Sequence, residues 1–232
     1  MNKFINVTRF FENDLYLKNQ ANILVRRSIV LDLLGDVKHT KILDIGCGDG
    51  SISIPFGSEN SLLLLDGSKF MLNRAKELSK SLPDVNYFLG DFFDFTSDSK
   101  FDVIFCIGVV SHASNVSDLL EKIKNHLSDD GVLVVQYSKI DHFYYRNHIK
   151  NKKKHDESYG YSLNTFTAME FTNLVEQHNY FILKQLGYSW PIRPISLLPN
   201  SIQFILINTL RKLSLFQFLN SEEVLLLRKN KS

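Results

Sequence analysis

The residues best suited to chemistry stand in one short stretch, Lys41 to Gly50, where an apolar run ends in three closely spaced glycines. This pattern predicts a buried strand leading into a tight turn, because glycine accepts positive φ angles and lets a ligand approach the backbone. The acid before the turn, Asp44, suits a cationic ammonium better than a phosphate. The spacing is G-x-G-x-G, with Ser51 where a dinucleotide-binding turn has its third glycine. The stretch therefore favours a ligand other than a dinucleotide.

Other acids and polar residues follow further apolar runs. Asp66 ends a run of four leucines, about twenty positions after Asp44, an interval at which an acid can reach ribose hydroxyls beside the next strand. Asp91 follows a third run, and the segment 107–112 follows a fourth. Because ligands of open parallel sheets bind beyond the carboxyl ends of the strands, these positions predict one shared site.

Together these stretches resemble the motifs of the class I S-adenosylmethionine-dependent methyltransferases. Lys41–Gly50 is similar to the first motif, and 66–76 to a D-x-S-x-x-M-L-x-x-A run. Gly90–Phe92 and 101–112 are similar to the third and fourth motifs, so the resemblance covers roughly residues 40 to 138. It implies S-adenosylmethionine as cofactor and S-adenosylhomocysteine as product. It also implies a cofactor site made of Asp44, Gly46, Cys47, Gly48, Asp66, Gly67, Met71, Asp91, Phe92 and Ile107.

The alternation of segments predicts an α/β fold: a Rossmann-like, mostly parallel sheet of seven strands, with helices on both faces and the last strand antiparallel. The expected strands are 41–45, 61–66, 85–89, 101–107, 131–138, 180–189 and 223–228, and the expected helices 50–56, 68–81, 115–127 and 168–178. We expect a single methyltransferase domain over 1–232, divided into a helical lead-in (1–40), a cofactor-binding core (41–138) and two substrate-side insertions or lid segments (139–170 and 190–220).

Composition narrows the class of protein. The chain has 232 residues, 44% of them hydrophobic and 22% charged, which is typical of a soluble globular protein. A net charge of +2 gives no overall basic field, so no nucleic-acid partner is expected. Cys47 and Cys106 form no Cys-x-x-Cys pair, which indicates neither a zinc site nor a disulfide framework. No signal-peptide or membrane-spanning run is found, so we expect a cytoplasmic protein.

The lead-in and the first insertion each have two possible roles. In the lead-in, Tyr16 or the Arg26–Arg27 pair is expected near the methionine carboxylate of the cofactor. The alternative is that the tyrosine packs against the protein and the arginines are solvated. In the first insertion, His142, Tyr144 and Tyr161 are expected to contact the methyl acceptor. The basic run Lys152–Lys154 would favour an anionic acceptor, or it is a solvated loop.

A helix is expected within the second insertion, from Ile202 to Leu219. It is too polar to span a bilayer. Four roles remain open: a lid over the acceptor, a dimer surface, an interfacial helix in peripheral membrane contact through 200–219, or a plain packed helix. The oligomeric state is not determined by the sequence.

The protein mainly has to position the acceptor against the methyl group, because the methyl group of a sulfonium is already activated for in-line displacement. A hydroxyl acceptor must also lose a proton, and His112 is the first candidate for the base. The alternative is that His112 only packs or hydrogen-bonds beneath the cofactor. The segment 107–112 contains no carboxylate, so a metal-assisted mechanism is not expected.

We therefore expect a transferase that methylates a small molecule, favouring a hydroxyl oxygen of a sugar, lipid-linked glycan, quinone-like compound or other metabolite. The alternatives are N-methylation of a small amine, and a non-catalytic partner subunit that keeps the fold.

Overall fold

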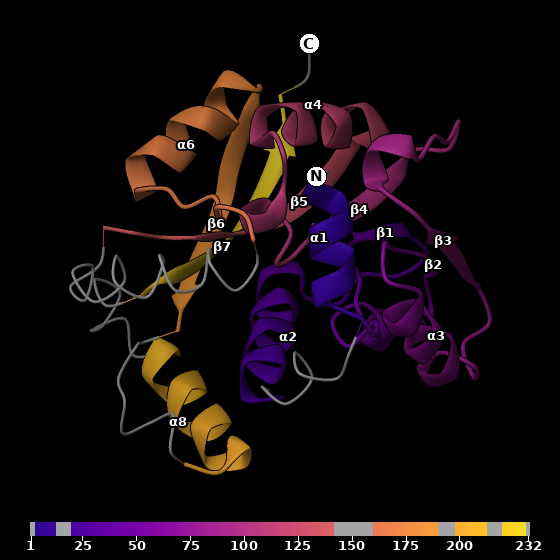
Figure 1. Cartoon of the computed structure of the whole chain (residues 1–232), viewed down its shortest axis with the longest axis horizontal. Coiled ribbons are helices and arrows are strands. Elements are labelled where there is room, and N and C mark those ends of the chain that lie inside the picture. Colours follow the sequence, from indigo (N-terminus) through magenta and orange to yellow (C-terminus); the bar gives the residue numbers. More distant parts are fainter. Residues whose placement is uncertain (1–2, 13–19, 142–159, 190–197, 213–219, 231–232) are drawn as a thin grey trace.

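The computed structural model describes residues 3–12, 20–141, 160–189, 198–212 and 220–230 (Figure 1). A seven-stranded sheet runs through the protein in the order β3-β2-β1-β4-β5-β7-β6. The strands are β1 (Lys41–Ile45), β2 (Ser61–Asp66), β3 (Val85–Leu89), β4 (Phe101–Cys106), β5 (Leu127–Ser138), β6 (Tyr180–Tyr188) and β7 (Glu222–Lys229). The α-helices are α1 (Lys3–Phe10), α2 (Gln20–Leu34), α3 (Lys69–Leu78), α4 (Val116–His126), α6 (Ala168–Gln177) and α8 (Asn200–Lys212), and the short 3-10 helices are η2 (Ile54–Phe56), η3 (Phe92–Asp94) and η4 (Val110–His112).

The direction of the strands decides which residues meet at each edge of the sheet. Strands β1 to β5 pair in parallel, so their carboxyl ends share one edge. Strand β7 is antiparallel to β5 and β6. Its first residue, Glu222, therefore pairs with Ser138 at the carboxyl end of β5. The predicted fold class, a mostly parallel sheet whose last strand is antiparallel, is confirmed.

Helices cover both faces of the sheet (Figure 1). On one face, α4 and α6 bury residues such as Ile123 and Phe171 in a shared core. On the other face, α2, α3 and α8 bury residues such as Ile29, Leu72 and Ile207. A sheet buried on both faces explains why the central strands are continuous apolar runs rather than alternating ones.

Local signals set where several helices begin and end. The hydroxyl of Ser68 accepts the Met71 N–H and caps the start of α3. Thr167 and Glu170 form a capping box at the start of α6, as the sequence predicts. Helix α2 ends before Gly35. The φ angle of this glycine is 69°, which lies outside the right-handed helical region.

Two elements differ from the expected ones. The expected helix at 50–56 is wrong for most of its length, because Gly50 at φ 76° leaves the right-handed region and only Ile54–Phe56 closes a 3-10 turn. Strand β5 begins at Leu127, before the Asp-Asp-Gly sequence that predicts a turn. The pairing with β4 shifts register after Phe101, and this irregularity takes up the extra residues within the strand.

Helix α8 lies beside α2 and is held there by polar side chains (Figure 1). Asn208 accepts a hydrogen bond from Ser28 at 3.1 Å, and Arg211 pairs with Asp32 at 2.5 Å. The polar residues that interrupt its apolar pattern therefore include the ones that attach it to α2. Ile202 and Ile205 remain exposed, and the rest of the expected helix, 213–219, lies outside the described residues.

No helix within the described ranges is long and apolar enough to cross a membrane.

Candidate active site

A cavity of about 420 Å³ lies at the carboxyl edge of the sheet. The loops after β1, β2, β3 and β4 contribute to its lining, and so do α1 and α2 (Figure 1). His112 lines this cavity. So do all the residues expected to hold the cofactor, which are Asp44, Gly46, Cys47, Gly48, Asp66, Gly67, Met71, Asp91, Phe92 and Ile107.

The glycine turn after β1 is left-handed at each of its three glycines. Gly46, Gly48 and Gly50 have φ values of 66°, 56° and 76°. At Gly46 a side chain is excluded for a second reason, because an added Cβ would lie 2.6 Å from Val109 Cγ2. The turn consequently exposes backbone to the cavity where larger residues would be strained and would fill it.

Asp66 ties the turn to the end of β2. Its Oδ2 accepts the Gly48 N–H at 2.8 Å, and its Oδ1 accepts the Ser68 N–H at 2.7 Å. Burial raises the pKa of this carboxyl, while the backbone N–H groups oppose the shift. Each oxygen of a carboxylate has two lone pairs, so Asp66 retains capacity to accept ligand hydroxyls.

Asp44 lies deeper, at the end of β1, and is 3% exposed. Its Oδ2 accepts a hydrogen bond from Ser53 Oγ at 2.7 Å. Burial, reinforced by the nearby charges of Asp66 and Asp49, raises the pKa of Asp44 to about 7. A carboxyl of this kind is stabilised in its ionised form when a cation binds beside it.

Cys47 and Asp91 also line the cavity. Burial raises the pKa of the Cys47 thiol well above its usual range, so this cysteine is a packing residue rather than a nucleophile. Asp91 caps η3 by accepting the Phe93 N–H at 3.0 Å, which brings Phe92 and Phe93 to the cavity wall.

Comparison with known proteins identifies the family. Residues 36–184, more than half of the chain, match the model of the methyltransferase domain family. The chain belongs to the methyltransferase domain family. The resemblance carried by its motifs is thereby confirmed.

Individual relatives match less of the methyltransferase. A ubiquinone biosynthesis O-methyltransferase of Rickettsia felis is 26% identical over 102 residues, which are 43% of this chain and 42% of that protein. The chain thus spans less than half the length of the curated relatives it matches first.

Solved structures match over nearly the whole chain. A methyltransferase from Thermotoga maritima, a possible histamine N-methyltransferase, has a TM-score of 0.70 at 15% identity, covering 99% of this chain and 100% of that one. Magnesium protoporphyrin IX methyltransferase of Synechocystis, with bound S-adenosylhomocysteine, has a TM-score of 0.66 at 13% identity and the same coverage. At such identities the likeness shows the shared fold alone.

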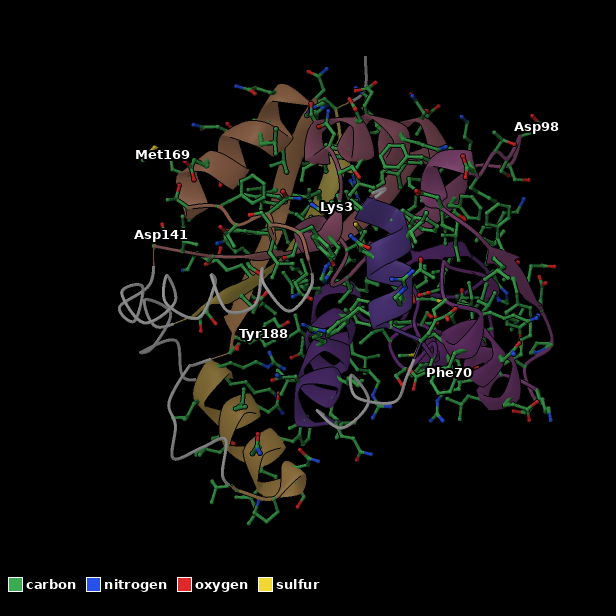
Figure 2. The ribbon with its side chains drawn as sticks, viewed as in Figure 1. Lys3, Phe70, Asp98, Asp141, Met169 and Tyr188 are labelled. Carbon is green, nitrogen blue, oxygen red and sulfur yellow. The ribbon has the colours of Figure 1, made fainter. Side chains whose placement is uncertain are left out.

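Helix α1 of the methyltransferase closes one side of the cavity. Phe4 and Thr8 line it and approach the loop after β2, where a Cβ on Gly67 would lie 2.7 Å from Phe4 Cζ. Lys3, at one end of α1 in Figure 2, donates a hydrogen bond to the Ala113 carbonyl at 2.8 Å. These residues were missed by sequence reasoning, because nothing in their local pattern indicates which surface the helix covers.

His112 lies at the end of η4 and contacts one expected acceptor residue. Its Nδ1 and the Tyr161 hydroxyl share a hydrogen bond of 2.7 Å. Burial, followed by the charges of Lys3 and Arg26, lowers the pKa of His112 to about 4. The imidazole is therefore neutral at physiological pH and is a weak base. His142 and Tyr144, the other expected acceptor residues, lie outside the described residues.

Arg26 lines the cavity and is thus not the solvated side chain of one sequence alternative. Its Nε donates to the Tyr188 hydroxyl at 2.6 Å, and Figure 2 shows Tyr188 where β6 ends near α8. Tyr16 lies outside the described residues, as does the basic run 152–154.

A polar group that the sequence did not indicate stands at the ends of β5 and β7. Glu222 accepts hydrogen bonds from Gln136 and Ser138, and all three residues line the cavity. The only available signal was the adjacent pair Glu222–Glu223 before an apolar strand. Alternation puts one of the two on each face of the sheet, but it does not say which cavity either residue faces.

Within the described part of the chain, no group of three or more His, Cys, Asp or Glu residues could hold a metal ion.

Proposed function

We propose that this methyltransferase transfers the methyl group of S-adenosylmethionine to a hydroxyl oxygen of a small molecule. The observation that carries the proposal is one cavity with two chemically different halves. Asp44, Asp66 and the glycine turn form an anionic half at the ends of β1 and β2. Ser138 and Glu222 form a second polar half at the ends of β5 and β7.

The residues of the first half fit the cofactor. Asp66 has lone pairs for the ribose hydroxyls, and the buried Asp44 carboxylate suits a molecule that carries a sulfonium and an ammonium. Thr8 Oγ1, on the wall formed by α1, is buried and has no hydrogen-bond partner among the described residues. A ligand that supplies such a partner would relieve the cost of burying that hydroxyl.

When bound, S-adenosylmethionine supplies an activated methyl group, and the chain has to hold the acceptor in line and manage its proton. We place the acceptor in the second half of the cavity, beside η4 and the segment 160–166. Asn164 attaches that segment to η4, since its Nδ2 donates to the Val110 and Ala113 carbonyls at 2.9 and 2.8 Å. The insertions 139–170 and 190–220 are proposed to belong to this acceptor side.

Electrostatics favours oxygen over nitrogen as the attacking atom. Lys3 and Arg26 both place positive charge near His112, which is the reason the two residues lower its pKa. Close to His112 this positive charge stabilises negative charge that develops on an acceptor oxygen. We assign His112, with Tyr161, a positioning role in this half, because its weak basicity suits a hydrogen-bonding partner better than a proton acceptor.

Binding of the cofactor tests the proposal first. Isothermal titration of the purified protein with S-adenosylmethionine and S-adenosylhomocysteine should show binding of both, with NADH as a control that does not bind. Methyl transfer from labelled S-adenosylmethionine to matched hydroxyl and amine compounds then separates the two acceptor atoms. Binding of NADH alone, or transfer confined to amines, would contradict the proposal.

A further inference from the structure

The carboxylate of Glu222 is held in a defined position at the cavity wall. Gln136 Nε2 donates to its Oε2 at 2.7 Å. Ser138 Oγ lies 3.0 Å from Oε1 and 3.2 Å from Oε2. Ser138 also contacts Ser111, from the η4 segment, at 3.0 Å between the hydroxyl oxygens. Two side chains of β5 therefore hold this carboxylate, and the η4 segment supports one of them through Ser111.

The amide oxygen of Gln136, Oε1, accepts no hydrogen bond from the described residues. Because a carboxylate only accepts hydrogen bonds, the amide nitrogen of Gln136 must face Glu222. Its amide oxygen then points elsewhere, and this buried atom has no partner among the described residues. Gln136 is 4% exposed, so a partner in the cavity would remove a real energetic cost.

The position of Glu222 separates it from the cofactor half. In the sheet order, β4 lies between β1, which carries the glycine turn, and β5, which pairs with β7. Two strands, β4 and β5, thus lie between Asp44 on β1 and Glu222 on β7, and three lie between Asp66 on β2 and Glu222. A carboxylate on the far side of the same cavity is placed to meet the second substrate.

The groups that face Glu222 suit a proton acceptor. Burial raises the pKa of Glu222, while Arg26, Gln136 and Ser138 oppose the shift and keep the ionised form accessible. Arg26 is itself fixed by its hydrogen bond to Tyr188. By contrast, the nearby His112 has a pKa of about 4 and shares its Nδ1 with Tyr161.

We propose that Glu222 is the proton acceptor of the reaction and that it selects the acceptor by its hydroxyl group, whose one proton it accepts. The inference rests on the proposed function. The oxygen–carbon bond forms as the carbon–sulfur bond breaks, and the hydroxyl proton passes to Glu222. The methyl ether and neutral S-adenosylhomocysteine leave, and Glu222 then returns the proton to solvent. Ile23, Leu163 and Phe11 also line the cavity, so the acceptor carries an apolar body.

A matched pair of probes tests the selection without requiring turnover. The probes are 2-naphthol and its methyl ether, 2-methoxynaphthalene, titrated into the protein saturated with S-adenosylhomocysteine. The wild type should bind the naphthol more tightly than the ether by roughly tenfold to a hundredfold, as expected for a hydrogen bond to a charged group. Glu222→Ala should abolish this preference.

Turnover separates a proton acceptor from a binding residue. Glu222→Gln keeps an oxygen that accepts a hydrogen bond, so the naphthol should still bind, but the rate of methyl transfer to it should fall by roughly a hundredfold or more. If Glu222 accepts the proton, the rate should depend on its ionisation in the wild type, and this pH dependence should be absent in Glu222→Gln. The matched control is Glu59→Gln, the same substitution in an exposed ion pair with Lys38, which should change neither property.

Each other outcome overturns the inference. These outcomes are equal binding of the two probes, binding of neither, a preference that survives in Glu222→Ala, and an unchanged rate and pH profile in Glu222→Gln. Unchanged affinity of both variants for S-adenosylhomocysteine shows that they are folded. If the wild type fails to bind S-adenosylhomocysteine at all, the proposed function itself fails, which is a different result from failure of the probes.

Discussion

At the scale of the residue, the proposed cofactor half contains two carboxylates in different surroundings. Asp66 is engaged by backbone N–H groups on both oxygens, which fixes its orientation at the end of β2. Asp44 has one hydroxyl donor, from Ser53, and its pKa is raised to about 7 chiefly by burial. The first is suited to orienting hydroxyls, and the second to responding to a cation.

Cofactor binding should therefore release a proton from Asp44 below about pH 7. A bound cation favours the ionised carboxyl, so the affinity for S-adenosylmethionine should fall by up to about tenfold for each pH unit below about 7. Calorimetry in two buffers of different ionisation enthalpy measures the release, and Asp44→Asn should remove this proton-linked component. Proton release that persists unchanged in Asp44→Asn would contradict the assignment.

Without cofactor, Asp44 should make the stability of the folded protein fall as the pH rises, whereas it makes the cofactor affinity rise. Its pKa in the folded protein is raised from 3.8 to about 7, so the native state binds the extra proton between these values. Stability should consequently fall as the pH rises through that window and level off above it, because the unfolded state gives up the proton first. Urea unfolding of wild type and Asp44→Asn at several pH values measures the difference.

Asp66→Ala should weaken cofactor binding by roughly 1.5–3 kcal/mol, the range for a hydrogen bond to a charged group. Asp66→Asn is the matched variant, since its amide oxygen can still accept the Gly48 N–H while the charge is lost. Calorimetric dissociation constants for both variants give the measurement. If Asp66→Ala binds as the wild type does, the carboxylate is not the ribose partner.

At the scale of the element, α1 is positioned by close contact with the loop after β2. An added Cβ at Gly67 would meet Phe4 Cζ at 2.7 Å and Thr8 Oγ1 at 2.8 Å. The helix also reaches the other half of the cavity, where Lys3 lies over the Tyr161 ring at 5.2 Å and bonds the Ala113 carbonyl. Helix α1 therefore spans both halves of the proposed site.

Gly67→Ala should displace α1 and reduce cofactor affinity. The binding free energy should become less favourable by about 1–3 kcal/mol, the range typical of overpacking. The test is a double-mutant cycle with Phe4→Ala and Thr8→Ala, which together remove the atoms that the new methyl group meets. In that background Gly67→Ala should cost much less. An equal cost in both backgrounds, measured by calorimetry with S-adenosylhomocysteine, would show that contact with α1 is not the cause.

At the scale of the whole molecule, the order of the strands divides the cavity. The cofactor half is made at the ends of β1, β2 and β3, and the proposed acceptor half at the ends of β4 and β5 and the start of β7. The join between β5 and β7 is reinforced by a buried ion pair, Lys139 Nζ to Glu223 Oε1 at 2.8 Å. Tyr137 and Gln185 also donate hydrogen bonds to Glu223.

Removing one partner of that pair should destabilise the whole protein. Glu223→Gln leaves Lys139 buried without its counter-ion, and the cost should be about 3–5 kcal/mol. The exposed pair Lys38–Glu59 has a similar distance, 3.0 Å, and its loss in Lys38→Met should cost much less, because solvent screens the two charges. Urea unfolding compares the two, and equal losses would contradict a stabilising role that depends on burial.

Much of the cofactor half follows from the sequence alone. Strand ends, glycines that need positive φ angles, and acids next to them are local features, and each is written within a few residues of the chain. The sequence could therefore predict that Asp44, Gly46 and Asp66 meet at one cavity, because the carboxyl ends of parallel strands must share one edge. The family match begins near the first motif and extends to residue 184, beyond the range of roughly 40 to 138 that the motifs cover.

Only the tertiary structure decided what completes the cavity. Glu222 meets Gln136 and Ser138 across more than eighty residues of chain, and their contact depends on the antiparallel register of β5 and β7. Likewise, Lys3 and Arg26 are charges on helical segments, and local periodicity cannot say which loop a helix will cover. Local pattern specifies the backbone of a site, whereas pairing between distant elements selects the side chains that face each other in it.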